Sequence, residues 1–361
     1  MDRTLVESRV ETLPYSWYVD PAVAAAEHDR IFLRSWQYAG HLGELAGPGS
    51  LFPTQVGGLP VIVALDREGE LRGHLNVCRH RGTILVSEPQ TRGTIQCPYH
   101  AWTYGLDGAL RAAPRSKDEP DFETDGLGLV PVQVDTWGPF VFVNPDPEAP
   151  PLAEALGDLP AVVAENGLDV SALRFHHRTT YGINANWKIA IENYLECYHC
   201  QLNHPDLMHV IDEQAQRHES AGLRLSQFPP LHPDVEAGRA PYDARGGPPT
   251  AQYHILFPAM KFNVNPGRPN LSIGPMWPVA TDRTSAWLDY FFAEGTDGAW
   301  VEQMLEFDNQ VGAEDIALVE AVQRGAGSGA LPHGRLLTRT EVLIGAFQDL
   351  VRERVEPGLD G

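Results

Sequence analysis

The chain has 361 residues, 43% of them hydrophobic, which is enough for a substantial core and excludes a disordered or fibrous protein. Its 27 Lys and Arg against 48 Asp and Glu give a net charge of −21, so nucleic acid and anionic membranes are not expected partners. It has only four cysteines, no apolar leader and no run long enough to span a membrane. We therefore expect a cytoplasmic protein with reduced thiols rather than a disulfide scaffold.

The chain from about residue 50 to residue 145 is rich in short β-type runs separated by turn residues. Leu59–Leu65 and Glu70–Val77, for example, flank the turn residues Asp66–Gly69. Short strands joined in this way predict a small antiparallel sandwich or barrel. The stretch 144–151 then has four prolines in eight residues, and we place a domain boundary at this linker.

The rest of the chain has a mixed pattern. We expect a helix from Asn186 to about Gln201, strands between Gln252 and Phe292, and long amphipathic helices over Trp300–Gln323 and Thr338–Val355. The expected fold class is therefore α+β, with a β-sandwich domain followed by a domain of sheet and helices.

Two short motifs in the β-rich part carry candidate metal ligands. Cys78-Arg-His80 and Cys97-Pro-Tyr-His100 each offer one thiolate and one imidazole at the tip of a predicted hairpin. Two Cys and two His can hold a tetrahedral zinc ion, or a Rieske [2Fe–2S] cluster with the Cys on one iron and the His on the other. Ligand identity alone does not separate these two alternatives.

The residues around these motifs complete the patterns C-x-H-R-G and C-P-Y-H-x-W-x-Y. In this respect the sequence resembles the Rieske domain of ring-hydroxylating oxygenases. The resemblance implies that Cys78 and Cys97 ligate one iron of a [2Fe–2S] cluster, and that His80 and His100 ligate the other.

A second group of candidate ligands lies near the end of the first helix expected after the linker. Glu196 and His199 are spaced to share one helical face, whereas His204 needs a bend, which Pro205 favours. Two imidazoles and a carboxylate form the facial triad that binds non-haem Fe(II). A buried core His, a zinc or redox C-x-x-C motif, and half of a di-iron site are alternatives. The di-iron alternative needs a second Glu-x-x-His, which the sequence lacks.

The segment N-W-K-x-x-x-E-N-Y-x-E-C-Y-H-x-x-x-x-H-P resembles the iron-site helix of the same oxygenase family. The resemblance implies that His199 and His204 are iron ligands and that Glu196 links the iron site to the cluster, with Cys197 and Cys200 taking no part. The commonest family version has Asp in place of this Glu. In having Glu, the chain is similar to relatives that oxidise quaternary ammonium compounds.

The third iron ligand in the family is an Asp near the start of a distant helix with the pattern E-D-x-x-x-x-E-x-x-Q. This pattern begins at Glu314, so the resemblance implies that Asp315 is the ligand. Asp308 is a competing candidate. An acidic helix start can also be no more than a favourable contact with the helix dipole.

The resemblance implies the terminal oxygenase of a Rieske non-haem iron system, a mono- or dioxygenase. Residues 1–40 would pack with the catalytic domain, residues 41–150 would form the Rieske [2Fe–2S] domain, and residues 151–361 a helix-grip domain with mononuclear Fe(II). The expected reaction hydroxylates or oxidatively demethylates a small organic substrate, either a quaternary ammonium compound (a betaine) or an aromatic acid. Four aromatic residues are candidates for a cage around an ammonium group: Trp187, Tyr194, Tyr198 and Phe262.

The sequence has no Gly-x-Gly-x-x-Gly fingerprint, so a ferredoxin or flavin reductase is the expected electron donor. It would dock on arginines near the cluster motifs, namely Arg72, Arg79, Arg81 and Arg92. The resemblance also implies a homotrimer, or a hexamer of stacked trimers, in which Glu196 accepts a hydrogen bond from His100 of a neighbour. The alternatives are a Rieske-type electron-transfer protein with a ligand-binding domain and no oxygenase activity, and a zinc-stabilised binding protein.

Overall fold

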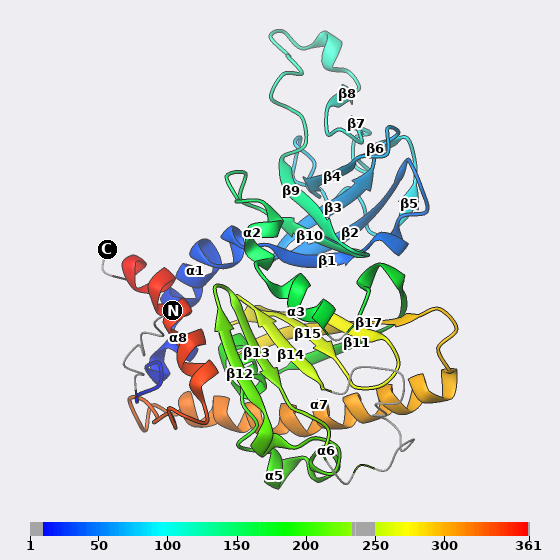
Figure 1. The fold of residues 1–361 in the computed structure, drawn as a ribbon. Coiled ribbons are helices and arrows are strands. Elements are labelled where there is room, and N and C mark those ends of the chain that lie inside the picture. Colours follow the sequence, from blue (N-terminus) through cyan, green and yellow to red (C-terminus); the bar gives the residue numbers. More distant parts are fainter. Residues whose placement is uncertain (1–9, 166, 233–234, 236–249, 360–361) are drawn as a thin grey trace. The chain divides into compact units, whose positions relative to one another are not determined.

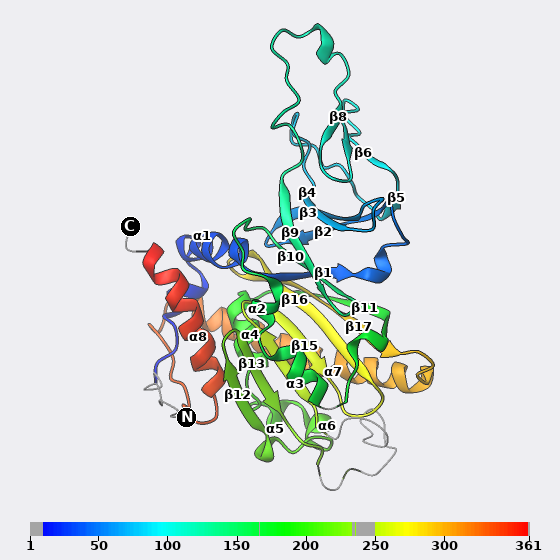
Figure 2. The ribbon, with the colours of Figure 1, turned by 45° about the horizontal axis from the view of Figure 1, so that its top comes forward.

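The computed structural model describes residues 10–165, 167–232, 235 and 250–359 of the chain. Figure 1 traces the fold, and Figure 2 gives a second view. The chain divides into two compact units. One unit is Leu33–Leu152, and the other combines Met1–Phe32 with Ala153–Gly361.

The Leu33–Leu152 unit contains a seven-stranded antiparallel sheet in the order β1-β10-β9-β4-β3-β2-β5 and a three-stranded sheet in the order β6-β7-β8. Gly57 and Gly58 close the β2–β3 hairpin with positive φ angles of 56° and 79°, which favour glycine. The strands are β1 (Gln37–His41), β2 (Ser50–Val56), β3 (Leu59–Leu65), β4 (Leu71–Leu75), β5 (Gln90–Thr91), β6 (Thr94–Gln96), β7 (Thr103–Gly105), β8 (Leu110–Ala112), β9 (Pro131–Trp137) and β10 (Phe140–Asn144).

The other unit is built on a seven-stranded antiparallel sheet in the order β11-β17-β16-β15-β14-β13-β12. Its strands are β11 (Leu173–Ile183), β12 (Arg217–Ala221), β13 (Arg224–Phe228), β14 (Gln252–Leu256), β15 (Met260–Val264), β16 (Asn270–Ala280) and β17 (Arg283–Ala293). Its helices are α1 (Pro21–Arg30), α3 (Leu159–Glu165), α4 (Trp187–Tyr194), α5 (Cys200–Asn203), α6 (Pro205–Met208), α7 (Gly298–Ala326) and α8 (Val342–Val355), and α2 (Leu152–Leu156) lies at the boundary between the units.

The long helix α7 runs along one face of this sheet (Figures 1 and 2). Val301 and Met304 of α7 pack on Leu288, Tyr290 and Phe292 of β17, and all five are buried. Helix α8 lies beside α1 at one side of the same unit. The contacts of Val301 and Met304 with β17 hold one face of α7 against the sheet.

The predicted α+β class is confirmed, with an antiparallel β unit first and a unit of sheet and helices after it. The strands expected between Gln252 and Phe292 are present as β14 to β17. The helix expected from Asn186 to about Gln201 is shorter, because α4 ends at Tyr194. Strand β1 pairs with β10, so the first unit begins before the expected residue 41. No helix in the described ranges is long and apolar enough to cross a membrane.

Candidate active site

Two loops in the Leu33–Leu152 unit carry the Cys and His pairs. One loop follows β4 and the other follows β6. In both, the cysteine N–H donates to a carbonyl five residues on, at 2.8 Å for Cys78 and 2.7 Å for Cys97. Gly82 and Ala101, four residues after each cysteine, have positive φ angles of 72° and 58° and return a hydrogen bond to the cysteine carbonyl. The two cluster loops, 78–83 and 97–102, therefore share one backbone conformation.

The four candidate ligands divide into an inner and an outer pair. The thiols of Cys78 and Cys97 are free and buried, each 2% exposed. The imidazoles of His80 and His100 are exposed, with their ring centroids 4.8 Å apart. Two buried thiols behind two exposed imidazoles fit a cluster with unlike ends, one iron bound by sulfur and the other by nitrogen.

Tyr104 lies behind the buried thiols. Its hydroxyl accepts from the Arg79 N–H at 3.1 Å and lies 3.3 Å from Cys78 Sγ. Burial, followed by the hydrogen bond to Cys78, raises the pKa of Tyr104. The phenol therefore remains a hydrogen-bond donor toward the sulfur, and such donors raise the reduction potential of an iron–sulfur cluster.

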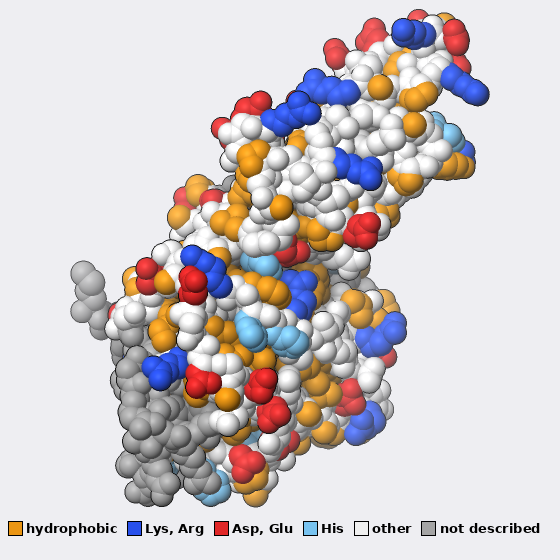
Figure 3. Space-filling model, turned by 90° about the vertical axis from the view of Figure 1, so that its right-hand side faces the viewer, with side chains coloured by type: hydrophobic (Ala, Val, Ile, Leu, Met, Phe, Trp, Pro, Cys, Tyr) orange, Lys and Arg blue, Asp and Glu red, His pale blue; other side chains and the backbone are white. Residues whose placement is uncertain are grey.

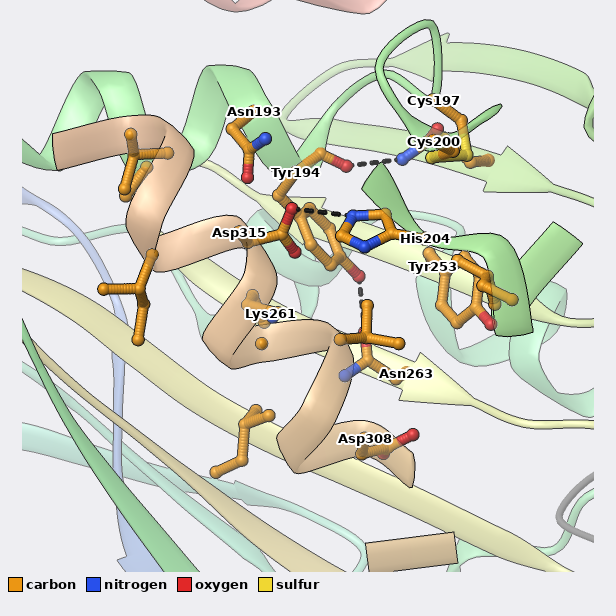
Figure 4. A pocket seen from close by; sticks show the side chains of 18 of the residues that line it. Asn193, Tyr194, Cys197, Cys200, His204, Tyr253, Lys261, Asn263, Asp308 and Asp315 are labelled. Atoms are coloured by element: carbon orange, nitrogen blue, oxygen red, sulfur yellow. Dashed lines mark hydrogen bonds and ion pairs between the residues drawn. A yellow bond between two sulfur atoms is a disulfide. The ribbon is translucent and has the colours of Figure 1, made fainter. Parts of the chain in front are cut away.

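The second group of ligands lies in the Ala153–Gly361 part of the chain. His199 Nε2 and His204 Nε2 are 3.2 Å apart. Asp315 Oδ1 lies 3.0 Å from His204 Nε2 and 3.2 Å from His199 Nε2. His199 precedes α5, His204 precedes Pro205 at the start of α6, and Asp315 lies on α7. Figure 4 shows His204 and Asp315 pointing toward each other.

Each of these imidazoles has a second carboxylate on its other nitrogen. His199 Nδ1 is 2.5 Å from Glu196 Oε1, and His204 Nδ1 is 2.7 Å from Glu314 Oε2. Burial would lower the pKa of His199, but hydrogen bonds to Asp315 and Glu196 outweigh it and raise this pKa to about 9. Burial would raise the pKa of Asp315, but hydrogen bonds from His199 and His204 outweigh it and lower this pKa to about 2. The carboxylates that hold a proton on His199 would also favour binding of a metal cation between the imidazoles.

The His199–His204–Asp315 group fits one metal ion with open positions. Its three donor atoms lie 3.0 to 3.2 Å from one another, as expected for ligands about 2.1 Å from one ion and about 90° apart. Cys200 lies close by, with its Sγ 3.9 Å from His199 Nε2. Its sulfur is bound to Cys197 in a disulfide, so it offers no thiolate.

The structure corrects two expectations here. Reduced thiols were expected throughout, but Cys197 and Cys200 are paired, which their Cα separation of 4.9 Å allows.

Glu196 and His199 were expected on one helical face, but both lie between α4 and α5. The Glu196 carboxylate accepts the backbone N–H groups of Tyr198 and His199, and this local turn replaces the continued helix.

Helix α4 is fixed by two buried contacts with α1. Glu27 accepts a hydrogen bond from Trp187 Nε1 at 2.8 Å and pairs with Lys188 Nζ at 2.5 Å. Asn186 caps the helix by accepting the Lys188 N–H. The N-W-K motif therefore anchors the segment that leads to the metal ligands.

A cavity of about 170 Å³ lies beside the His199–His204–Asp315 group. Of the four aromatic residues suggested from the sequence, only Tyr194 lines it. Trp187 and Phe262 are buried elsewhere and Tyr198 is 63% exposed. The cavity-lining residues that sequence reasoning missed include five from four strands: Tyr181, Tyr253, Lys261, Asn263 and Trp287.

Asp308 and Asp315 occupy different parts of this cavity. Asp315 lies with the two histidines, whereas Asp308 accepts a 3.4 Å hydrogen bond from Asn265. Figure 4 shows Asp308 further along α7 from Asp315. The geometry therefore favours Asp315 as the third metal ligand.

A unit with a two-Cys, two-His pair of loops and a unit with a two-His, one-carboxylate group define a Rieske-type non-haem iron oxygenase. Residues 35–132 match the Rieske [2Fe-2S] domain family, and residues 170–357 match the ring hydroxylating alpha subunit catalytic domain family. The chain belongs to the family of ring-hydroxylating oxygenase alpha subunits, which use a Rieske cluster and a mononuclear iron. A pure electron carrier is not favoured, because the catalytic domain itself is present.

Similar proteins include named monooxygenases. The chain is 31% identical over 330 residues to the carnitine monooxygenase oxygenase subunit of Escherichia coli K12, covering 90% of this chain and 87% of that protein. It is 30% identical to the chloroplastic choline monooxygenase of Spinacia oleracea, covering 93% and 76%. A solved quaternary ammonium Rieske monooxygenase superposes with a TM-score of 0.87 at 28% identity, covering 96% of each chain. The protein is thus a terminal oxygenase and an oxidoreductase.

Proposed function

We propose that this oxygenase monooxygenates a small quaternary ammonium compound at a C–H bond near the nitrogen. The cavity beside the His199–His204–Asp315 group supports this proposal. Its lining includes the aromatic rings of Tyr181, Tyr253 and Trp287 and the carboxylate of Asp308, groups that attract an ammonium without donating to it. The names of the carnitine and choline monooxygenases point to the same substrate class.

The geometry of the site supports the ligand roles in this proposal. His199, His204 and Asp315 would hold the mononuclear iron, which supplies O2 activation when bound. Glu196 and Glu314 fix the orientation of the two imidazoles through their Nδ1 atoms. Insertion of one oxygen atom into the C–H bond, with the other leaving as water, takes two electrons and two protons.

The electrons enter through the cluster loops. Cys78, Cys97, His80 and His100 hold the [2Fe–2S] cluster, with the two imidazoles on the exposed side where an electron can leave. A ferredoxin or flavin reductase supplies the electrons. On the face shown in Figure 3, Lys and Arg side chains lie among Asp and Glu, so a donor docking there meets a surface of mixed charge.

The chain works as a homotrimer, or as a hexamer of two such rings, in this proposal. Tyr99, beside His100, is 55% exposed, while Tyr198 and Leu202, beside His199, are 63% and 89% exposed. A head-to-tail contact that covers these apolar side chains closes into a ring. It would bring the neighbour's His100 to Glu196, whose carboxylate then lies between an imidazole of each centre.

The domain roles complete the proposal. The unit Leu33–Leu152 would form the cluster domain and residues 153–359 the catalytic domain, on which residues 10–32 would pack. Contacts of Glu27 with Trp187 and Lys188 support the last role, since α1 holds α4 in place.

A single-turnover experiment tests the substrate class. Reduced, iron-loaded protein is mixed with oxygen and one of three compounds: a trimethylammonium carboxylate, choline or benzoate. Mass spectrometry should detect an oxygenated or demethylated product from an ammonium compound. Product from benzoate alone would replace the proposal with the aromatic acid alternative.

A further inference from the structure

Lys261 stands at the centre of the catalytic sheet. It lies on β15, the fourth of seven strands, and Lys261 and Asn263 both line the cavity. Phe262 between them is fully buried, as expected for alternating side chains. Lys261 is the one Lys or Arg among the described residues that line the cavity.

Lys261 is partly exposed, and the fully buried cations Lys188 and Arg224 of the same unit have carboxylate partners. Lys188 pairs with Glu27, and Arg224 forms two hydrogen bonds to Asp158, at 2.6 and 2.7 Å. For Lys261 the described residues provide no such ion pair. Its ammonium lies over the Tyr194 ring, 4.4 Å from the centroid. This ring contact attracts the cation but fills none of its three donor positions.

Two carboxylates face Lys261 without a hydrogen bond to it. Burial lowers the pKa of Lys261, and the negative charges of Asp315 and Asp308 offset only part of this lowering. Asp315 lies within hydrogen-bonding distance of His199 and His204, where it serves the metal site. Figure 4 shows Lys261 in the pocket beside α7, between the labelled Asp315 and Asp308. An anion that enters the cavity would therefore find a donor without a hydrogen-bonded partner.

We infer that Lys261 binds a carboxylate group of the substrate, so that the site selects an ammonium carboxylate over the matching ammonium alcohol. The inference rests on the proposed function and narrows it from quaternary ammonium compounds in general to betaines. The Tyr194 hydroxyl donates a hydrogen bond to Asn263 Oδ1 at 2.5 Å, and this bond fixes the ring beneath the Lys261 ammonium. A substrate with no anionic group would leave Lys261 repelling its ammonium.

Binding to the iron-loaded protein tests this role. Calorimetry would compare γ-butyrobetaine with its primary alcohol analogue, in the wild type and in Lys261→Met. Loss of a charged hydrogen bond should weaken betaine binding by about 10- to 100-fold. Binding of the alcohol should weaken by less than about threefold, or strengthen, because a like charge is removed. Lys261→Arg should keep the preference, and Lys117→Met, an exposed lysine of the other unit, should leave both affinities unchanged.

The outcomes separate the two proposals. An equal effect of Lys261→Met on both ligands would overturn the role of Lys261 and leave the ammonium substrate class standing. Tight binding of benzoate that depends on Lys261, with no binding of either ammonium compound, would overturn the substrate class alone. If the betaine, the alcohol and benzoate all fail to bind, both the role of Lys261 and the ammonium substrate class are overturned. The wild type is a test by itself if the variant does not fold, since equal affinity for the betaine and the alcohol contradicts the inference.

Discussion

Glu314 Oε2 lies 2.7 Å from His204 Nδ1, on the side of the imidazole opposite Asp315. Neighbouring residues of α7 thus contact both nitrogens of one ring. Since a ligand imidazole is oriented and made more basic by a carboxylate on its other nitrogen, Glu314 is a positioning residue for His204.

Replacing Glu314 should therefore weaken the metal site. We expect Glu314→Ala to lower the affinity for ferrous iron by about 10- to 100-fold. Glu314→Gln should recover part of this loss, because its amide oxygen can still accept from His204. Anaerobic equilibrium dialysis measures the affinity. Glu306→Ala, at an exposed position of the same helix, is the matched control, and unchanged iron affinity in Glu314→Ala would contradict the role.

Removing a proposed ligand should separate the two metal centres. His199→Ala should lose mononuclear iron and turnover while the visible absorption of the [2Fe–2S] cluster stays. His209→Ala, an exposed histidine of the same segment, should keep both. Metal analysis and absorption spectra provide the measurement. Loss of the cluster bands in His199→Ala would mean that the two sites had been assigned wrongly.

Glu196 carries two roles in the proposal, since it contacts His199 Nδ1 and is the acceptor for a neighbour's His100. At saturating iron, Glu196→Gln should keep both centres loaded, because an amide oxygen still accepts from His199. Its coupled turnover should fall by about 10- to 100-fold. Rapid-mixing kinetics of cluster reoxidation with substrate and O2 isolate this step. Wild-type rates in the variant would rule out the bridging role.

Glu192 should make stability depend on pH. Burial is the main reason that its pKa rises to about 7, from an ordinary 4.5; Lys188 opposes this and Glu341 adds to it. Gln348 and Tyr18 donate to the carboxyl at 2.9 and 2.8 Å, which also opposes the rise in pKa, but burial outweighs them. Because its pKa is raised, the carboxyl binds the proton more tightly in the folded state than in the unfolded state. This stability is complete below about pH 4.5 and is lost as the pH rises through 7.

We expect the free energy of unfolding of Glu192→Gln to rise relative to the wild type by about 1 to 3 kcal/mol between pH 5 and pH 8. Urea titrations at several pH values measure it. Glu302→Gln, at an exposed position, should follow the wild type throughout. A difference between Glu192→Gln and the wild type that does not change with pH would show that Glu192 stays ionised in the folded protein.

Leu202 should report on assembly. An apolar side chain that is 89% exposed beside the iron site gains from burial in a subunit contact, so Leu202→Asp should shift the protein toward monomers. Leu331→Asp, at a position 61% exposed and on a different segment, is the control. Light scattering after gel filtration gives the mass. An unchanged mass for Leu202→Asp would remove this residue from the interface.

The sequence predicted local features better than long-range ones. The short β-type runs predicted hairpin loops that carry the C-x-H and C-x-x-H pairs, and Pro205 predicted the bend that turns His204 toward His199. Helical periodicity failed after Tyr194, because the Glu196 side chain competes for backbone N–H groups that a continuous helix would use. Periodicity does not register such competition.

Lys261 and Glu314 were missed for another reason. Both act on residues far away in the chain, and their partners depend on the strand register of β15 and the packing of α7. A lysine between Met260 and Phe262 in a strand-rich segment was a usable signal, since an ionised side chain rarely lies at a sheet centre without a purpose. The E-D pattern at residue 314 contained the other signal, although only its Asp was assigned a role.

The position of Lys261 also bears on protein engineering. Its side chain is only partly exposed in the folded chain, before any ligand arrives, so the folded protein bears a desolvation penalty that a methionine would not. Selection for heat resistance alone should therefore favour apolar replacements at residue 261 and discard substrate discrimination with them. Stabilised variants of this enzyme need this strand held constant.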